Sequence, residues 1–320
     1  SRTISSSTVE IQYKDGEVWN VWPNQSYDSE KGLFLLTGMG EGATDTNGVS
    51  YTLRAAYKRG GEVVTYSGEL PITTEAKTQI PNSGFDDWYT EKKKYLLSDW
   101  IVYYPYLQGE EGHWWSTNND RAQAWTVYPV QVTTCPAVIY TYDTRTGEGK
   151  AAEIHTSGSG GEYASTGEMM YPKSAFAGSI FIGSYSWSDK SEHKSLGHSF
   201  NTRPLGLSFW YKYKPYKTDA FKVLVEVKSG ETVIATGEYV PEAYSSEDLE
   251  YQQHTISLEY TNSLLKATSI SVQFLSTNKT SFTENDLQKN GTLTLTDFSD
   301  SWNAHFGSFL KIDDVELIYE

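Results

Sequence analysis

The segment with the clearest chemical potential is GHWWSTNNDRAQAWTVYP, residues 112–129, which sets three tryptophans among short polar side chains. Flat aromatic rings cover the apolar C–H faces of a sugar, while planar amides and a guanidinium hydrogen-bond its hydroxyls. A polyhydroxylated ring is therefore the ligand that suits this mixture of side chains. The candidate contacts in this segment are Trp114, Trp115, Asn118, Asn119 and Arg121.

The two adjacent tryptophans cannot both enter one core. Neighbouring side chains of a strand point to opposite faces, so Trp114 and Trp115 must have different surroundings. We predict that one packs inward and the other faces a ligand or a neighbouring domain. The alternative is that both serve packing, as most aromatic residues of β-proteins do. The polar run STNND argues against that alternative, because burying it would leave many polar groups to satisfy.

A second candidate wall lies in NTRPLGLSFWYKYKPY, residues 201–216, where we select Arg203, Trp210 and Tyr211 as further carbohydrate contacts. If this segment is a strand, Phe209, Tyr211 and Tyr213 share one face. Trp210 and Lys212 then share the other face.

Catalysis is the alternative to simple binding. Glycoside hydrolysis usually needs two carboxylates, one with a raised pKa, and Glu153, Glu168 and Asp189 lie in a glycine-rich region whose loops could present them. With 41 acidic residues in the chain, such candidates are easily found. The HExxH and GxSxG motifs are both missing from the sequence. A structural or adhesive protein that binds another protein is the third possibility.

Composition narrows the class of protein. The 26 basic and 41 acidic residues give a net charge of −15 over 320 residues, which repels nucleic acid and anionic membranes. No apolar run approaches the roughly 20 residues of a membrane span. The 24 Tyr, 10 Trp, 12 Phe and 26 Gly are typical of an all-β protein.

The spacing of the strand patterns predicts two domains. Up to Leu70, short alternating segments are separated by Asp-Gly, Asn-Gly and Gly-Gly turns, as in a small antiparallel sandwich. After a linker-like stretch, about ten strand patterns follow at longer intervals, which favours a two-sheet jelly roll. We predict an immunoglobulin-like β-sandwich over residues 1–78 and a jelly roll over residues 79–320.

Two motifs carry a resemblance to a known class. IPNSGFDDWYT near the start of the second domain and FLKIDDVELIYE at its end resemble jelly-roll carbohydrate-binding modules with a galactose-binding-like fold. The resemblance implies a structural calcium ion held by Asp86 and Asp313, with Asp314 as an alternative to Asp313. The carboxylates of the two motifs would repel each other unless a divalent ion or a basic partner neutralised them. No organic cofactor is implied.

A narrower resemblance covers almost the whole chain. The ordered stretches GFDDWYT, WWSTNND, KAAEIHTS, YASTGEM, FAGSIFIGSY, GHSFNTRPLGLSFWYKYKPY and KIDDVELIYE are similar to the Putative carbohydrate metabolism domain family. That family implies a jelly roll after a small immunoglobulin-like unit, in secreted or surface proteins of bacteria. We therefore expect a glycan-binding protein outside the cytoplasm. The start SRTISSSTVE lacks a secretion signal, so either the protein is cytoplasmic or a leader has been removed. The acidic, Tyr/Trp-rich and Ser/Thr-rich composition favours a removed leader, and a lipid anchor is left open.

Overall fold

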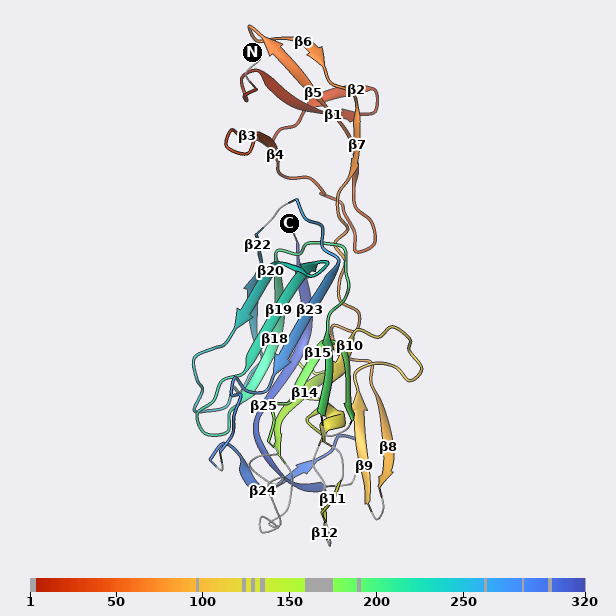
Figure 1. Cartoon of the computed structure of the whole chain (residues 1–320), viewed down its shortest axis with the longest axis vertical. Helices are drawn as coiled ribbons and strands as arrows, with labels where there is room; N and C mark the ends of the chain where they lie inside the picture. Colours follow the sequence, from red (N-terminus) through yellow and green to blue (C-terminus); the bar gives the residue numbers. More distant parts are fainter. Residues whose placement is uncertain are drawn as a thin grey trace. The chain divides into compact units, whose positions relative to one another are not determined.

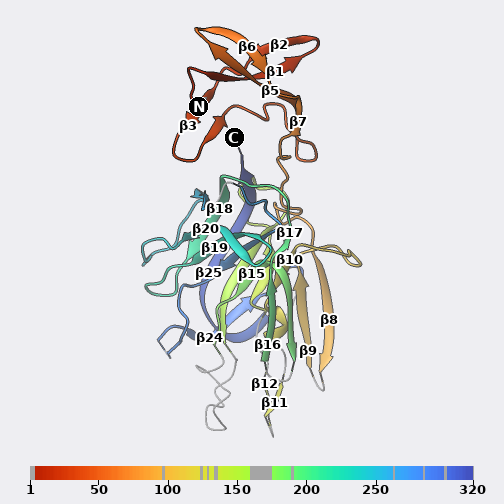
Figure 2. The ribbon, with the colours of Figure 1, turned by 45° about the horizontal axis from the view of Figure 1, so that its top comes forward.

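The protein is built of β-strands, as the composition predicts (Figures 1 and 2). This computed structural model describes residues 4–95, 98–122, 125–127, 130–132, 136–158, 175–188, 191–261, 264–283, 285–298 and 301–319. Over these ranges the one helical segment is the 3₁₀ turn η1 (Asn119–Arg121). The described part of the chain contains no helix with the length and hydropathy needed to cross a bilayer. The chain divides into two compact units, residues 1–78 with 319–320, and residues 79–318.

The first unit is a five-stranded antiparallel sheet with an additional hairpin. Its strands are β1 (Val9–Asp15), β2 (Val18–Val21), β3 (Gln25–Asp28), β4 (Leu33–Leu36), β5 (Ser50–Arg59), β6 (Glu62–Tyr66) and β7 (Leu70–Thr73). The sheet order is β2-β1-β5-β6, with β7 on β5, and β3 pairs with β4. Trp22 centres its core, making edge contacts with Tyr13 and Tyr51 while its indole N–H donates to the Thr37 carbonyl over 2.9 Å. The immunoglobulin-like topology of this unit stays a prediction.

The second unit is a β-sandwich of two antiparallel sheets. The eight-stranded sheet has the order β10-β15-β23-β19-β20-β22, with β16 on β15 and β17 on β23. Its strands are β10 (Trp115–Thr117), β15 (Ser179–Ser188), β16 (Ser191–Leu196), β17 (His198–Ser199), β19 (Lys222–Ser229), β20 (Thr232–Tyr239), β22 (Glu259–Tyr260) and β23 (Ser269–Leu275).

The six-stranded sheet has the order β13-β14-β25-β18-β21, with β24 on β25. Its strands are β13 (Val138–Thr141), β14 (Ala151–Gly158), β18 (Gly206–Lys214), β21 (Gln252–Ser257), β24 (Gln288–Thr294) and β25 (Ser301–Ile318). The hairpins β8 (Tyr89–Tyr95) with β9 (Ser98–Tyr104) and β11 (Trp125–Val127) with β12 (Val130–Val132) complete the unit. The long strand β25 lies between β14 and β18 in the sheet (Figure 1).

The core lies between the two sheets. Phe209 of β18 and Phe274 of β23 are both fully buried, with ring centroids 5.3 Å apart. Along β18 and β25, residues that enter this core alternate with residues on the outer face, because the side-chain period of a strand is two. Tyr213 and Leu310 are fully buried, whereas their neighbours Lys212 and Lys311 are on the outer face. The predicted all-β jelly-roll sandwich is confirmed, and its outer face is where charged and aromatic side chains meet.

Candidate carbohydrate-binding site

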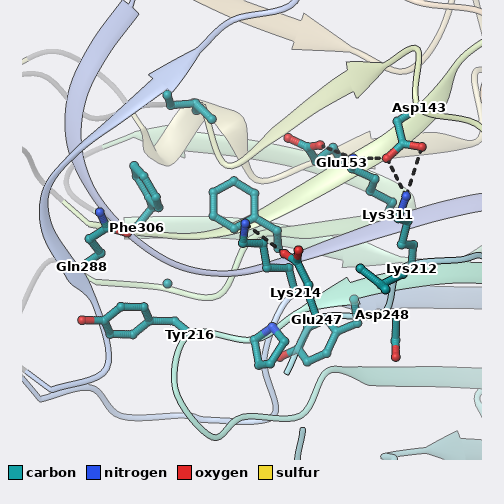
Figure 3. A pocket seen from close by; sticks show the side chains of 16 residues that line it. Asp143, Glu153, Lys212, Lys214, Tyr216, Glu247, Asp248, Gln288, Phe306 and Lys311 are labelled. Atoms are coloured by element: carbon teal, nitrogen blue, oxygen red, sulfur yellow. Dashed lines mark hydrogen bonds and ion pairs between the residues drawn. The ribbon is translucent and has the colours of Figure 1, made fainter. Parts of the chain in front are cut away.

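A cavity of about 620 Å³ opens on the outer face of β14, β25 and β18. Figure 3 shows the labelled side chains of this cavity, which fall into three groups: one at each end and one between them. Asp143, Glu153, Lys212 and Lys311 gather at one end; Gln288, Phe306 and Tyr216 lie at the other; Lys214 and Glu247 lie between them. The cavity therefore offers charged groups and apolar rings along one path.

Strand register explains the charged end. Glu153 of β14 is opposite Lys311 of β25, and Lys311 is opposite Lys212 of β18, so the three side chains form one row across the sheet. Asp143, in the turn after β13, joins this row from the edge. The Lys311 Nζ lies 2.5 Å from an Asp143 oxygen and 3.4 Å from a Glu153 oxygen. Lys212 Nζ is 3.1 Å from Asp143, and His155 Nε2 is 2.8 Å from the other Glu153 oxygen.

These contacts set the protonation of the row. Burial alone would raise the pKa of Glu153, but the hydrogen bonds and charges of His155 and Lys311 outweigh it and lower this pKa. Burial also opposes ionisation of Asp143, and again the bonds to Lys311 and Lys212 prevail and lower its pKa. For Lys311, burial favours the neutral amine, yet Glu153 and Asp143 together raise its pKa. Glu153, Asp143 and Lys311 are therefore all charged at neutral pH.

The opposite end of the cavity is more apolar. Phe306 and Phe309 meet edge to face, with ring centroids 5.2 Å apart, and both line the cavity with Tyr216. The exposed Leu249 adds a further apolar side chain to the lining. Rings of this kind can cover the C–H face of a ligand whose hydroxyls bond to the charged row.

Asp248 is a further acidic residue of the cavity lining, and its surroundings differ from those of Asp143 and Glu153. Its backbone N–H donates to the Tyr213 carbonyl over 2.8 Å, and one carboxylate oxygen accepts from Gln252 over 3.2 Å. Its other oxygen is buried and has no hydrogen-bond partner among the described residues. Burial raises the pKa of Asp248, whereas the pKa values of Asp143 and Glu153 are lowered by their bonds to cationic partners.

Of the residues predicted from the sequence, Glu153 lines this cavity, and Trp210 lies on the same face of β18 as Lys212. Trp210 is half-buried, with the Arg145 guanidinium 5.0 Å from its ring centroid. Tyr211 is instead in the core, 3% exposed, and its hydroxyl bonds to Tyr244 and Gln252. Arg203 is half-buried and does not line the cavity. The remaining catalytic candidates, Glu168 and Asp189, lie outside the described residues.

The two tryptophans of the WWSTNND segment have different surroundings. Trp115 points inward; it is 1% exposed, and its indole N–H donates to the Pro81 carbonyl over 2.9 Å. Trp114 is half-buried and stacks on the His198 imidazole, with ring centroids 4.4 Å apart. Trp114 is thus the one of the pair that keeps part of its ring accessible.

Asn118 and Asn119 have a structural use that differs from the predicted one. Each is buried, and each side-chain amide both donates to and accepts from the backbone of neighbouring segments. Asn119 donates to the Tyr103 and Val138 carbonyls over 2.9 and 2.8 Å and accepts from the Val138 N–H over 2.8 Å. These amides bond to backbone groups of neighbouring segments, so a ligand would have to compete with the fold for them. Arg121 is half-buried, with its guanidinium over the rings of Phe176 and Trp187.

The predicted metal ligands lie where the second unit begins and ends. Asp313 is buried, and its two carboxylate oxygens accept from the backbone N–H groups of Arg145 and Asp314 over 2.8 and 2.9 Å. One Asp86 oxygen accepts from the Lys150 N–H over 2.9 Å. Arg145 Nη2 lies 2.5 Å from Asp314 and supplies the basic partner that was the alternative to an ion.

The calcium ion is a prediction that these contacts do not test. Calcium takes six to eight oxygen ligands, and the described residues contain no group of three or more His, Cys, Asp or Glu side chains placed to hold a metal. The calcium ion stays a prediction that melting experiments can test.

Sequence reasoning missed most residues of the cavity lining, among them Asp143, Lys212, Asp248, Lys311, Phe306, Phe309 and Tyr216. Part of this lining could be recognised in the sequence FLKID. There, Phe309, Lys311 and Asp313 alternate with the apolar Leu310 and Ile312 at a period of two. What the pattern does not reveal is which strand lies next to which.

The fold and the cavity define a two-sheet β-sandwich with a ring-lined and charge-lined cavity on one outer face. Residues 84–318 match the family described as Putative carbohydrate metabolism domain, and the chain belongs to that family. A comparison with curated proteins gives no match.

Solved structures of carbohydrate-binding modules are similar to this chain at low identity. One is a structure of the promiscuous carbohydrate-binding modules from the β-sandwich superfamily, with 8% identity, 97% of this chain and 85% of that chain covered, and a TM-score of 0.31. TmCBM61 in complex with β-1,4-galactotriose has 11% identity, coverage of 75% and 97%, and a TM-score of 0.29. The family 11 carbohydrate-binding module of the cellulosomal cellulase Lic26A-Cel5E of Clostridium thermocellum has 9% identity, coverage of 66% and 91%, and a TM-score of 0.24.

Proposed function

We propose that this protein binds an oligosaccharide in the cavity on the outer face of the six-stranded sheet, as an accessory protein of glycan utilisation. We place this role outside the cell or at its surface, where large glycans are met. The membership of a carbohydrate metabolism family supports the ligand class.

The observation that carries the proposal is the charged row of Glu153, Lys311 and Lys212 beside the rings of Phe306 and Phe309. A hydrogen bond to a charged group contributes about 1.5–3 kcal/mol, and a stacked ring about 1 kcal/mol beyond the area it buries. The volume of about 620 Å³ exceeds the needs of a single sugar residue and lies within the usual range of ligand sites. An oligosaccharide can therefore reach both ends of the cavity.

The test is a glycan array followed by calorimetric titration of the best ligand into three variants. Lys212→Met removes a charge from the row, and Phe309→Ala removes a ring. We expect each to weaken binding about tenfold or more, at roughly 1.4 kcal/mol per tenfold. Lys222→Met is the matched control, because Lys222 is also a paired strand lysine of similar exposure, 25% against 24% for Lys212, but lies on β19 of the other sheet. Equal affinities in all three variants would remove the cavity as the binding site.

Hydrolysis is the second candidate function, and Asp248 is the observation in its favour. Glycosidases use one carboxyl that stays protonated and one that stays ionised. Burial raises the pKa of Asp248, while Glu153 in the same cavity lining has a lowered pKa. Incubating the bound glycan with wild type and with Asp248→Asn, followed by chromatography, distinguishes the two functions. Cleavage by wild type that Asp248→Asn abolishes establishes a hydrolase, whereas an intact glycan in both samples leaves binding alone.

A further inference from the structure

A second, smaller cavity lies between the end of β9, the β10–η1 segment and β15. Its volume is about 260 Å³, and none of its lining residues belongs to the lining of the cavity on the six-stranded sheet. The residues used below are Tyr104, Tyr106, His113, Asp120 and Ser184. Two of them, His113 and Asp120, flank the WWSTNN run that the sequence analysis selected.

Aromatic stacks form the wall of this cavity. The Tyr106 ring lies parallel to the His113 imidazole, with centroids 3.6 Å apart. Tyr104 stacks on Tyr89 at 4.5 Å and is tilted against Tyr106 at 5.7 Å. Because each ring is held by another, the surface is formed before any ligand arrives, and binding loses little side-chain entropy.

An acceptor without a donor lies beside these rings. The Asp120 Oδ1 atom is buried and has no hydrogen bond among the described residues. Lys93 Nζ is 4.0 Å from it, which offsets its charge but is beyond hydrogen-bond length. Buried polar atoms are rarely left in this state, so the Asp120 Oδ1 atom calls for a donor that the described chain does not supply.

We propose that this cavity is a second carbohydrate site, which holds one neutral sugar residue with its hydroxyls bonded to Asp120 and its ring against Tyr106. The volume lies just below the range of about 300–1,000 Å³ for drug-sized ligands, as a single sugar requires. Lys93 Nζ is shared between Asp120 at 4.0 Å and Glu91 at 3.6 Å, so the local charge does not select the donor. The parallel rings of Tyr106 and His113 suit the C–H face of a sugar, and we therefore assign the missing donor to a sugar hydroxyl. An anionic ligand is disfavoured by Asp120 itself.

Saturation-transfer NMR with D-glucose, D-galactose, D-mannose and D-glucosamine as probes tests this inference on the full chain. We expect a signal from a neutral hexose that Asp120→Asn weakens about tenfold or more, because the amide replaces a charged acceptor. Ser184→Tyr should abolish the signal by filling the cavity from an exposed position. Glu111→Gln, an exposed acid of the neighbouring loop, is the matched control and should change nothing.

Melting curves separate a binding role of Asp120 from a structural one. An unpartnered buried oxygen disfavours folding, so Asp120→Asn should leave the melting temperature unchanged or raise it. A lowered melting temperature would show that Asp120 supports the fold and would overturn the inference. A hexose signal that survives both cavity variants, or binding of glucosamine alone, would overturn it as well.

Lys212→Met keeps the two sites distinguishable. It should weaken oligosaccharide binding at the six-stranded sheet and leave the hexose signal intact. Loss of the hexose signal in Lys212→Met would place the hexose in the larger cavity and overturn the second site. The second site does not depend on the larger cavity being functional.

Discussion

Replacing Lys311 by Met tests whether the charged row is held together by electrostatics. The Lys311 side chain is 21% exposed and its partner Glu153 is 13% exposed, so this is a largely buried ion pair. Removing one partner of a buried pair costs about 3–5 kcal/mol of stability. Here His155 still bonds to Glu153, and the contact with the more exposed Asp143 is worth about 1 kcal/mol or less. We expect a loss of about 2–3 kcal/mol at neutral pH, with the alkyl packing of the lysine largely retained by methionine.

The pH dependence of this loss distinguishes charge from packing. The pKa of Glu153 is lowered from 4.5, so its stabilising contribution is present above that value and is lost as the pH falls through the folded-state pKa. The pKa of Lys311 is raised from 10.5, so its contribution is present below that value and is lost as the pH rises through the folded-state pKa. The difference in the free energy of unfolding between wild type and Lys311→Met, here called the stability gap, should be widest between pH 4.5 and 10.5 and should narrow outside that window.

Urea denaturation of wild type and Lys311→Met at about pH 7 and about pH 3 measures the gap. Lys222→Met is again the control, since its partner Glu238 is 55% exposed and the pair should be worth about 1 kcal/mol or less at either pH. A gap that is as wide at pH 3 as at pH 7 would refute the electrostatic reasoning and assign the loss to packing.

Two further predictions concern the tryptophan pair and the metal. Trp115→Ala should cost about 3–5 kcal/mol in urea denaturation, as removal of a core indole does. Trp114→Ala should cost less, because its half-buried ring loses about 1 kcal/mol of stacking on His198 and only part of the buried area of a core indole; equal losses would contradict the assigned surroundings. If calcium binds at the terminal aspartates, it should raise the melting temperature relative to chelator, and Asp313→Ala should abolish the gain; identical curves in calcium and in chelator would remove the ion.

Much of the fold could be predicted because it rests on local pattern. Period-two alternation, turn dipeptides and aromatic composition identify strands whatever their partners are. The same rule places Trp210 and Lys212 on the face opposite to Tyr211, since adjacent residues of a strand cannot share a face. Trp114 and Trp115 also have different surroundings, although Trp114 lies just before the first residue of β10. The jelly-roll class followed from the number and spacing of such strands.

The roles of the polar residues could not be predicted in this way. Asn118 and Asn119 have the composition of a ligand site, yet they bond to backbone groups at residues 103, 138, 177 and 179. Which unpaired carbonyls lie within reach of an amide depends on how neighbouring segments end, and that is not encoded in the segment itself. Polar residue type therefore indicates hydrogen bonding but not its partner.

The sequence by itself determined that the chain is built of strands, the alternation of faces along strands such as β18 and the class of the fold, because these depend on neighbours in the chain. The tertiary structure alone decided the sites. Asp143, Glu153, Lys212 and Lys311 meet only because β25 pairs with β14 on one side and β18 on the other. Strand order is set by packing of the whole sandwich, so residues up to 168 positions apart in the chain form one charged row.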